Sequence, residues 1–163
     1  MKKFFTLIAL VAMALSAQAQ RIAWTEDDVA SAGTLDGKEF SNGDFAIKIV
    51  DTDSKVAIDK NNAYFGTDDA QEKFTHRLKS GGKSSSKNSI TATVPSKGTL
   101  KIFARTGSNN ATDRTVVVTQ GETELYNKVV QEADALKVKG MDDSDPDKDT
   151  NVYPVISVEV EAG

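Results

Sequence analysis

The chain has 163 residues, of which 39% are hydrophobic, 27% charged and 7% aromatic. These proportions fit one folded domain rather than a disordered chain, long enough to bury about 68–70% of the surface that the unfolded chain exposes. The sequence contains no cysteine, which excludes disulfides, thiolate metal sites and cysteine nucleophiles. Its single histidine, His76, excludes a site of clustered histidines and leaves little room for a Ser-His-Asp hydrolase.

The first 19 residues have the pattern of a secretory signal peptide. Lys2 and Lys3 precede an apolar stretch from Phe4 to Leu15, and the small residues of Ala17-Gln18-Ala19 mark a cleavage site. The apolar stretch is shorter than the roughly 20 residues that a membrane-spanning helix needs, although an uncleaved anchor is the alternative. We therefore expect a signal peptide over 1–19 and a secreted module, periplasmic or extracellular, over 20–163.

After residue 20, short runs of alternating apolar and polar residues are separated by turn-forming pairs such as Asn42-Gly43 and Gln120-Gly121. Period-two alternation with many β-branched residues is typical of strands that bury one face. The apolar positions of five such runs are Phe45, Ile47 and Ile49; Phe74, His76 and Leu78; Ile90, Ala92 and Val94; Leu100, Ile102 and Ala104; and Val152, Pro154, Ile156, Val158 and Val160.

Two segments carry weaker signals. Thr25-Glu26-Asp27-Asp28 predicts a capping box before a short helix, which Gly33 limits to about two turns. Residues 127–138 could form an amphipathic helix, but two strands, Glu124–Val130 and Ala135–Lys139, agree better with the neighbouring β-runs. The expected fold is therefore all-β, a single antiparallel β-sandwich of the jelly-roll type.

The chain stops at Ala162-Gly163, directly after the last apolar run. Sheet domains rarely leave an apolar strand unpaired at an edge. We therefore expect the sequence to be a C-terminally truncated piece of a longer polypeptide, without its closing strand and further domains.

Charge is segregated along the chain. Without Lys2 and Lys3 there are 18 Lys and Arg against 24 Asp and Glu, a net charge of −6. Residues 71–114 hold nine basic and two acidic side chains, so this block is +7 and the remainder is −13. Arg77 and Lys79 are two positions apart and are expected to share a strand face. Lys101 and Arg105 are expected to do the same.

If these strands are neighbours, their cations form one patch that attracts anions at long range. Arginine binds carboxylates bidentately, and lysine adds a point charge. The alternative is a solvated surface balanced by acids from the rest of the chain. Nucleic acid is a poor candidate because the protein is expected to be exported and is acidic overall. Its sequence also contains no RNA- or DNA-binding motif in which aromatic residues alternate with basic ones.

The aromatic residues divide into two groups. Five phenylalanines after the leader are expected in the core, whereas four amphipathic rings could lie at the surface as partners for a sugar. Tyr64 is the best of these because it lies in 61–66, which we expect to be a polar loop. Partial burial is the alternative for all four rings, which are Trp24, Tyr64, Tyr126 and Tyr153.

Acidic residues give only weak signals for metal or catalysis. Asp143, Asp145 and Asp147 alternate as hard oxygen ligands of calcium can, but the glycine and distal glutamate of an EF-hand are missing, so a solvated loop is the alternative. Asp51 and Asp53 form a still weaker pair. No other cofactor is expected. His76 is expected in the core, and no pair of carboxylates has glycosidase spacing, so we expect no catalytic residues and no enzyme activity.

Three segments, in this order along the chain, resemble a known kind of module: Phe74-Thr75-His76-Arg77-Leu78-Lys79-Ser80-Gly81-Gly82, then Gly98-Thr99-Leu100-Lys101-Ile102-Phe103-Ala104-Arg105, then Asp113-Arg114-Thr115-Val116-Val117-Val118. They resemble the motifs of non-catalytic β-sandwich modules of secreted Bacteroidetes (Prevotella-like) proteins, which often lie beside pectate lyase or other plant-polysaccharide-degrading domains. The resemblance spans most of 20–163.

The resemblance implies a carbohydrate-binding module that targets an attached or partner enzyme to plant cell-wall polysaccharide, with acidic pectin as the candidate. The alternative is a structural or adhesive domain that packs on a catalytic domain or a cell-surface partner. By resemblance, uronate carboxylates would bind at Arg77, Lys79, Arg105 and Arg114, and we add Lys101 from the shared face and Tyr64 as the sugar-packing ring.

Overall fold

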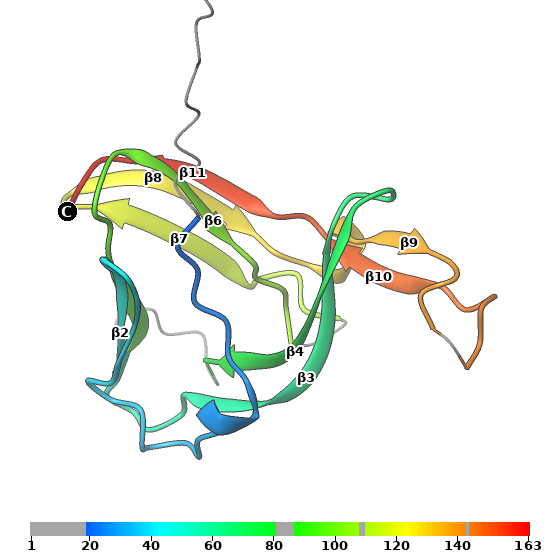
Figure 1. The fold of residues 1–163 in the computed structure, drawn as a ribbon, viewed down its shortest axis with the longest axis horizontal. Coiled ribbons are helices and arrows are strands. Elements are labelled where there is room, and N and C mark those ends of the chain that lie inside the picture. Colours follow the sequence, from blue (N-terminus) through cyan, green and yellow to red (C-terminus); the bar gives the residue numbers. More distant parts are fainter. Residues whose placement is uncertain (1–18, 81–86, 108–109, 143) are drawn as a thin grey trace, which may run out of the picture.

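The computed structural model describes residues 19–80, 87–107, 110–142 and 144–163, and this part of the chain is almost entirely β-structure (Figure 1). Its helical content is two single 3-10 turns, η1 (Glu26–Asp28) and η2 (Glu132–Asp134). The predicted all-β fold with antiparallel sheets in a sandwich-like arrangement is confirmed. Almost all of the expected signal peptide lies outside the described residues.

The strands form four small sheets. The first has the order β1-β2-β5, with β1 (Glu39–Asn42), β2 (Phe45–Asp51) and β5 (Asn88–Thr93). The second has the order β4-β3-β10-β9, with β4 (Gln71–Lys79), β3 (Ala57–Gly66), β10 (Thr150–Tyr153) and β9 (Leu136–Val138). The other two are the pairs β6 (Gly98–Ile102) with β11 (Ile156–Val160), and β7 (Thr115–Gln120) with β8 (Thr123–Val129). Neighbouring strands are antiparallel except β3 and β10, which run parallel.

One hydrophobic core is formed by side chains of the first sheet, the start of β3 and the segments that precede them. Leu35, Ile49, Val56 and Ile58 are fully or almost fully buried there. Trp24 covers this cluster and meets the ring of Phe40 edge-on, with the centroids 6.1 Å apart. The alternation predicted for β2 is confirmed, because Ile47, Ile49 and Asp51 face inward.

A second core joins the two smaller sheets. Ile156, Val158 and Val160 of β11 are buried and contact apolar side chains of β6, β7 and β8. In Figure 1 these four strands run alongside one another at one end of the molecule. The last apolar strand, β11, pairs with β6 along its length, and Gly163 beyond it exchanges two backbone hydrogen bonds with Val94. The expected truncation of the chain stays a prediction.

The last apolar run is two strands, not one. Val152 and Tyr153 belong to β10 in the second sheet, whereas Ile156 begins β11 beside β6. Pro154, which lies between them, is exposed and has no N–H to donate to a ladder. The chain therefore passes from one sheet to the next at the proline, and the expectation of a single five-position face was wrong.

The N-terminal capping box is present, but the helix after it is shorter than expected. The side chain of Asp28 accepts hydrogen bonds from the backbone N–H and the hydroxyl of Thr25, at 2.8 and 2.9 Å. The segment then turns extended because Ala30 exchanges two backbone hydrogen bonds with Ile58 of β3. This long-range pairing limits η1 to one turn. The preference for strands over a helix within 127–138 was correct.

The segment 61–66 is not a loop. It belongs to β3, which pairs with β4 along most of its length and with β10 at its end. Four successive polar residues, 59–62, conceal the strand in the sequence because they break the alternation, and the register shifts between Lys60 and Ala63. The two-residue turns predicted after Asn42 and Gln120 are present, and Gly43 and Gly121 adopt the left-handed conformation that they require.

We expect Ile49→Ala to lower the free energy of unfolding by about 2–5 kcal/mol, because it leaves a cavity at a side chain with no exposed surface. The matched control is Ile90→Ala. Ile90 lies opposite Ile49 in the β2–β5 register but is 49% exposed, so the loss should be about 1 kcal/mol or less. Urea unfolding of both variants measures the difference. Equal losses would contradict this assignment of the core.

Candidate functional site

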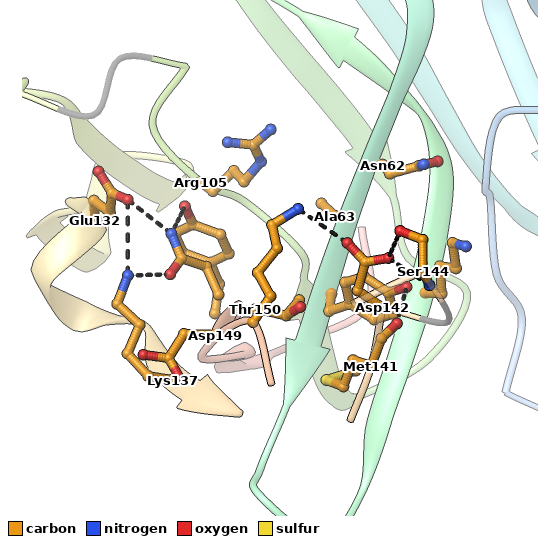
Figure 2. A pocket seen from close by; sticks show the side chains of 15 residues that line it. Asn62, Ala63, Arg105, Glu132, Lys137, Met141, Asp142, Ser144, Asp149 and Thr150 are labelled. Carbon is orange, nitrogen blue, oxygen red and sulfur yellow. Dashed lines mark hydrogen bonds and ion pairs between the residues drawn. The ribbon is translucent and has the colours of Figure 1, made fainter. Parts of the chain in front are cut away.

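An open hollow of about 670 Å³ lies between the second sheet and the segment 141–149 (Figure 2). Its walls come from β3, β4, β9, β10 and η2, together with Arg105, which follows β6. Most of its lining is polar, and the charged side chains that line it are Lys73, Arg105, Glu132, Lys137, Asp142, Lys148 and Asp149. We call this region the hollow.

Tyr64 provides the aromatic wall of the hollow. It lies on β3 between Lys73 of β4 and Val152 of β10, which are its partners in the strand registers. Its hydroxyl is 3.5 Å from the carbonyl oxygen of Met141, and the amine of Lys73 lies 5.6 Å from the centre of its ring. The ring is half-buried, so it combines a fixed position with an accessible surface beside a cation.

Arg105 brings a second cation to the hollow. Its guanidinium donates to the side-chain oxygen of Asn61 and to the carbonyl oxygen of Thr106, and it lies 5.5 Å from the ring centre of buried Tyr153. All of these partners are neutral. Among the described residues, neither Arg105 nor Lys73 forms an ion pair with a carboxylate. The hollow therefore holds two cations whose charge is available to an anion.

On the η2 side of the hollow, the charged side chains Glu132 and Lys137 are already paired with each other. Asn151 donates from its amide to Glu132 at 2.8 Å, and the amine of Lys137 donates to the amide oxygen of Asn151. Lys137 also lies 3.9 Å from the carboxylate of Glu132. Figure 2 shows these contacts as one network on the η2 side. This wall offers hydrogen-bonding groups without a free charge.

The described residues of 141–149 form the rim of the hollow, and Asp142 is the centre of their contacts. Hydrogen bonds from the hydroxyl of Ser144 at 2.6 Å and from the amine of Lys148 at 2.9 Å keep the pKa of Asp142 far below its usual value. The same contact raises the pKa of Lys148. Asp142 is therefore ionised at neutral pH and paired within its own segment.

The calcium site suggested at Asp143, Asp145 and Asp147 stays a prediction. Asp145 and Asp147 are exposed, and Asp143 lies outside the described residues. Nowhere in the described chain do three or more histidine or acidic side chains come together as a metal site.

Arg77 and Lys79 lie on β4, outside the hollow. The guanidinium of Arg77 donates hydrogen bonds to both carboxylate oxygens of Asp59 on β3, at 2.7 and 3.2 Å. This hydrogen bonding lowers the pKa of Asp59, against a smaller opposing effect of burial, and the charge of Lys79 adds to the lowering. Arg77 thus already holds a carboxylate of its own chain, while Lys79 is exposed.

Lys101 and Arg105 do not share a strand face, contrary to expectation. β6 ends at Ile102, so Arg105 is beyond the strand, while Lys101 lies opposite Ser157 on the exposed face of β6. Arg114 precedes β7 and is 3.8 Å from Asp113. Neither Lys101 nor Arg114 lines the hollow. The single cationic patch expected from the sequence is therefore not formed.

Of the six predicted binding residues, the hollow brings together Tyr64 and Arg105. Lys73 belongs to the same basic block but was not singled out. Lys73 could have been identified from its position opposite Tyr64 in the β3–β4 register, but only if β3 had been recognised as a strand. His76 is buried on the face of Phe74 and Leu78 as expected, and its ring lies 3.1 Å from the carboxylate of Glu26.

No protein family, curated protein or solved structure matches this chain. Within the described ranges, no helix is long and apolar enough to cross a membrane.

We expect the rim of the hollow to lose its structure only at acidic pH. A carboxylate with a lowered pKa contributes stability above its unfolded pKa, near 3.8, and loses that contribution as pH falls through the folded pKa. The amide signal of Ser144, followed by NMR, should therefore titrate well below pH 3.8 in the wild-type protein and not in Asp142→Asn. Asp147→Asn is the control and should titrate like the wild type. A midpoint at or above pH 3.8 would contradict the contact.

Proposed function

We propose that this protein is a non-catalytic carbohydrate-binding module that binds an acidic plant cell-wall polysaccharide in the hollow. The observation that carries the proposal is that one hollow is lined by the Tyr64 ring, with Lys73 beside it, and by Arg105, and that neither cation has a carboxylate partner among the described residues. A uronate residue has the matching chemistry, because its ring has an apolar face and its carboxylate carries a negative charge.

The two parts of a uronate have separate partners in the hollow. The sugar ring packs against Tyr64, as aromatic side chains do with apolar surface. The carboxylate binds the guanidinium of Arg105, whose planar fork fits two oxygens, and Lys73 adds a point charge. The amides of Asn62 and Asn151 also line the hollow and supply partners for hydroxyl groups.

The size and openness of the hollow agree with this ligand. Its volume of about 670 Å³ is within the usual range for ligand sites. Because the hollow is open, a polysaccharide can extend beyond it, which a closed cavity would not allow.

Binding of this kind serves an enzyme attached to the module or acting beside it. A module that holds the polysaccharide raises the effective concentration of substrate without any chemistry of its own. The proposal includes a secreted protein, as the signal-peptide pattern of residues 1–19 predicts, and a catalytic partner that degrades plant polysaccharide, as the resemblance to such modules implies.

A structural or adhesive role is the second candidate. Val117 and Val129 are 46% and 43% exposed and share one face of the β7–β8 hairpin, because their register partners are Asn127 and Thr115. This role would pair all four basic residues named by the resemblance with acids, and Arg77 is engaged with Asp59 in this way. A protein with only this role would show no retardation by any polysaccharide, in any variant.

The test is affinity electrophoresis through gels that contain polygalacturonate at graded salt. We expect the wild-type protein to be retarded at low salt and less at high salt, because ions screen the charge contribution. Arg105→Ala and Tyr64→Ala should each weaken binding by roughly tenfold, as expected for the loss of a charged hydrogen bond or a ring contact.

Lys101→Ala is the matched control, because it removes one positive charge from the exposed face of β6 outside the hollow and should leave retardation unchanged. Fully methyl-esterified polymer, which lacks free carboxylates, should retard the wild type less than polygalacturonate does. The proposal fails if the wild type is not retarded at low salt, or if Lys101→Ala weakens binding as much as Arg105→Ala.

A further inference from the structure

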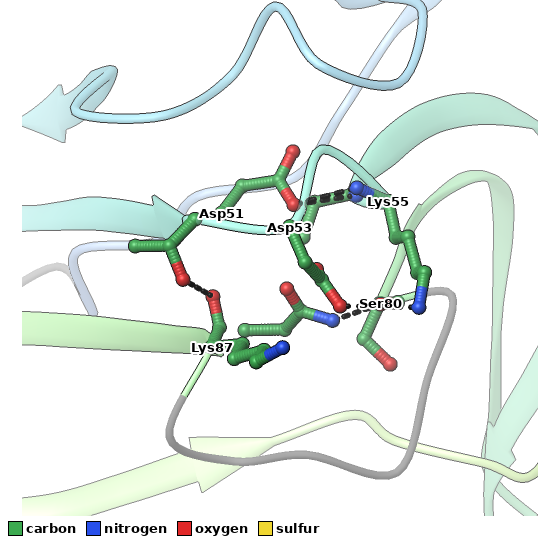
Figure 3. A network of polar contacts seen from close by, with 8 residues as sticks. Asp51, Asp53, Lys55, Ser80 and Lys87 are labelled. Carbon is green, nitrogen blue, oxygen red and sulfur yellow. Dashed lines mark hydrogen bonds and ion pairs between the residues drawn. The ribbon is translucent and has the colours of Figure 1, made fainter.

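A second polar site lies outside the hollow, where the turn between β2 and β3 meets the start of β5 (Figure 3). Asp51 is the last residue of β2 and Asn88 the first of β5, and the two are opposite each other in the register. Side chains at paired positions leave a sheet on the same face, with their Cβ atoms about 4.5–5.5 Å apart. Asp53 follows in the turn, and Figure 3 shows it between Asp51 and the chain at Ser80 and Lys87.

Each of the two carboxylates has one oxygen that is engaged and one oxygen that has no partner. Asp51 is 2% exposed, and its Oδ1 accepts from the backbone N–H groups of Lys55 and Val56 at 2.7 and 3.0 Å. The amine of Lys55 lies 3.2 Å from Oδ2 of Asp53. The remaining oxygens, Oδ2 of Asp51 and Oδ1 of Asp53, are buried without a hydrogen-bond partner.

The amide of Asn88 adds a third oxygen of the same kind. Its nitrogen donates to the carbonyl oxygen of Ser80 at 2.8 Å, which decides the orientation of the amide. Its Oδ1 is consequently directed away from Ser80, and it too is buried without a partner. Four buried side-chain atoms in the described residues have no hydrogen-bond partner, and three of them are oxygens. These three oxygens belong to Asp51, to Asn88 opposite it in the register, and to Asp53 two residues further along the chain.

Buried acceptors without donors are rare in folded proteins, and for a carboxylate the cost is greatest. Lys55 offsets only one of the two negative charges. What is missing is positive charge, and an oxygen-only set of carboxylates and an amide is the ligand chemistry of calcium rather than of softer metals. We propose that Asp51, Asp53 and Asn88 bind a calcium ion, with water completing its coordination.

Such an ion joins two parts of the fold that also meet through backbone pairing and through the hydroxyl of Thr52, which donates to the carbonyl oxygen of Lys87 at 3.4 Å. It ties the β2–β3 turn, in which Ser54 has a φ of 56°, to the first residue of β5. The site is independent of the hollow and of any polysaccharide. Its effect is therefore on stability, through preferential binding to the folded state.

The experiment is thermal unfolding of chelator-treated full-length protein, with calcium, magnesium or sodium added at equal ionic strength. We expect millimolar calcium to raise the Tm by at least about 3 °C, as tight binding to the folded state does in a domain of this size, and magnesium to raise it less. Asp53→Asn, which keeps the shape of the side chain, and Asn88→Ala should abolish the calcium response. Isothermal titration of the wild type with calcium should show one site.

The double variant Asp145→Asn/Asp147→Asn is the control and should keep the full response, because it alters only the acidic segment at the rim of the hollow. If calcium neither raises the Tm nor binds in the titration, the proposal is overturned and ordered water fills the site. It is also overturned if the response survives in Asp53→Asn or disappears in the control variant. Should Asn88→Ala fail to fold, Asp53→Asn and the titration still decide.

Discussion

The pairing of β3 with β4 is the constraint on which the rest of this structure depends. It places Lys73 opposite Tyr64, and it brings Asp59 into contact with Arg77. The same hairpin supports a cluster of rings in which Phe74 contacts both Phe65 and Phe103, at 5.6 and 4.8 Å between centroids. Because β3 also pairs with β10, one strand positions both the aromatic wall of the hollow and the sheet that supports its other side.

The basic residues of 71–114 differ in whether a carboxylate of the chain neutralises them. A cation that meets a carboxylate of the chain, as Arg77 does, is committed to the fold, whereas one held by amides, carbonyls or rings keeps its charge for a ligand. Arg105 and Lys73 belong to the second kind. Charge counts along the sequence cannot make this distinction, because acids at distant positions in the chain decide which cations are neutralised.

The sequence predicted the strands with clear alternation and failed where the alternation was broken. β2, β4, β5 and β6 were found because apolar residues recur at every second position, and β8 and β9 because strands agree better than a helix with the neighbouring β-runs. β3 was read as a loop since Asp59, Lys60 and Asn62 interrupt its pattern, and this error moved Tyr64 out of its sheet and left Lys73 unnoticed. Within the predicted site, only Tyr64 and Arg105 lie in the hollow.

By itself, the sequence determined the class of fold, the capping box before η1, the tight turns at Gly43 and Gly121 and the inward position of His76, because each follows from residues close together in the chain. Only the tertiary structure decided which cations lie together, where the last apolar run divides and which oxygens near Asp51 remain unpartnered. These depend on pairings between β3 and β10, β6 and β11, and β2 and β5, whose partners lie far apart in the chain and leave no local pattern.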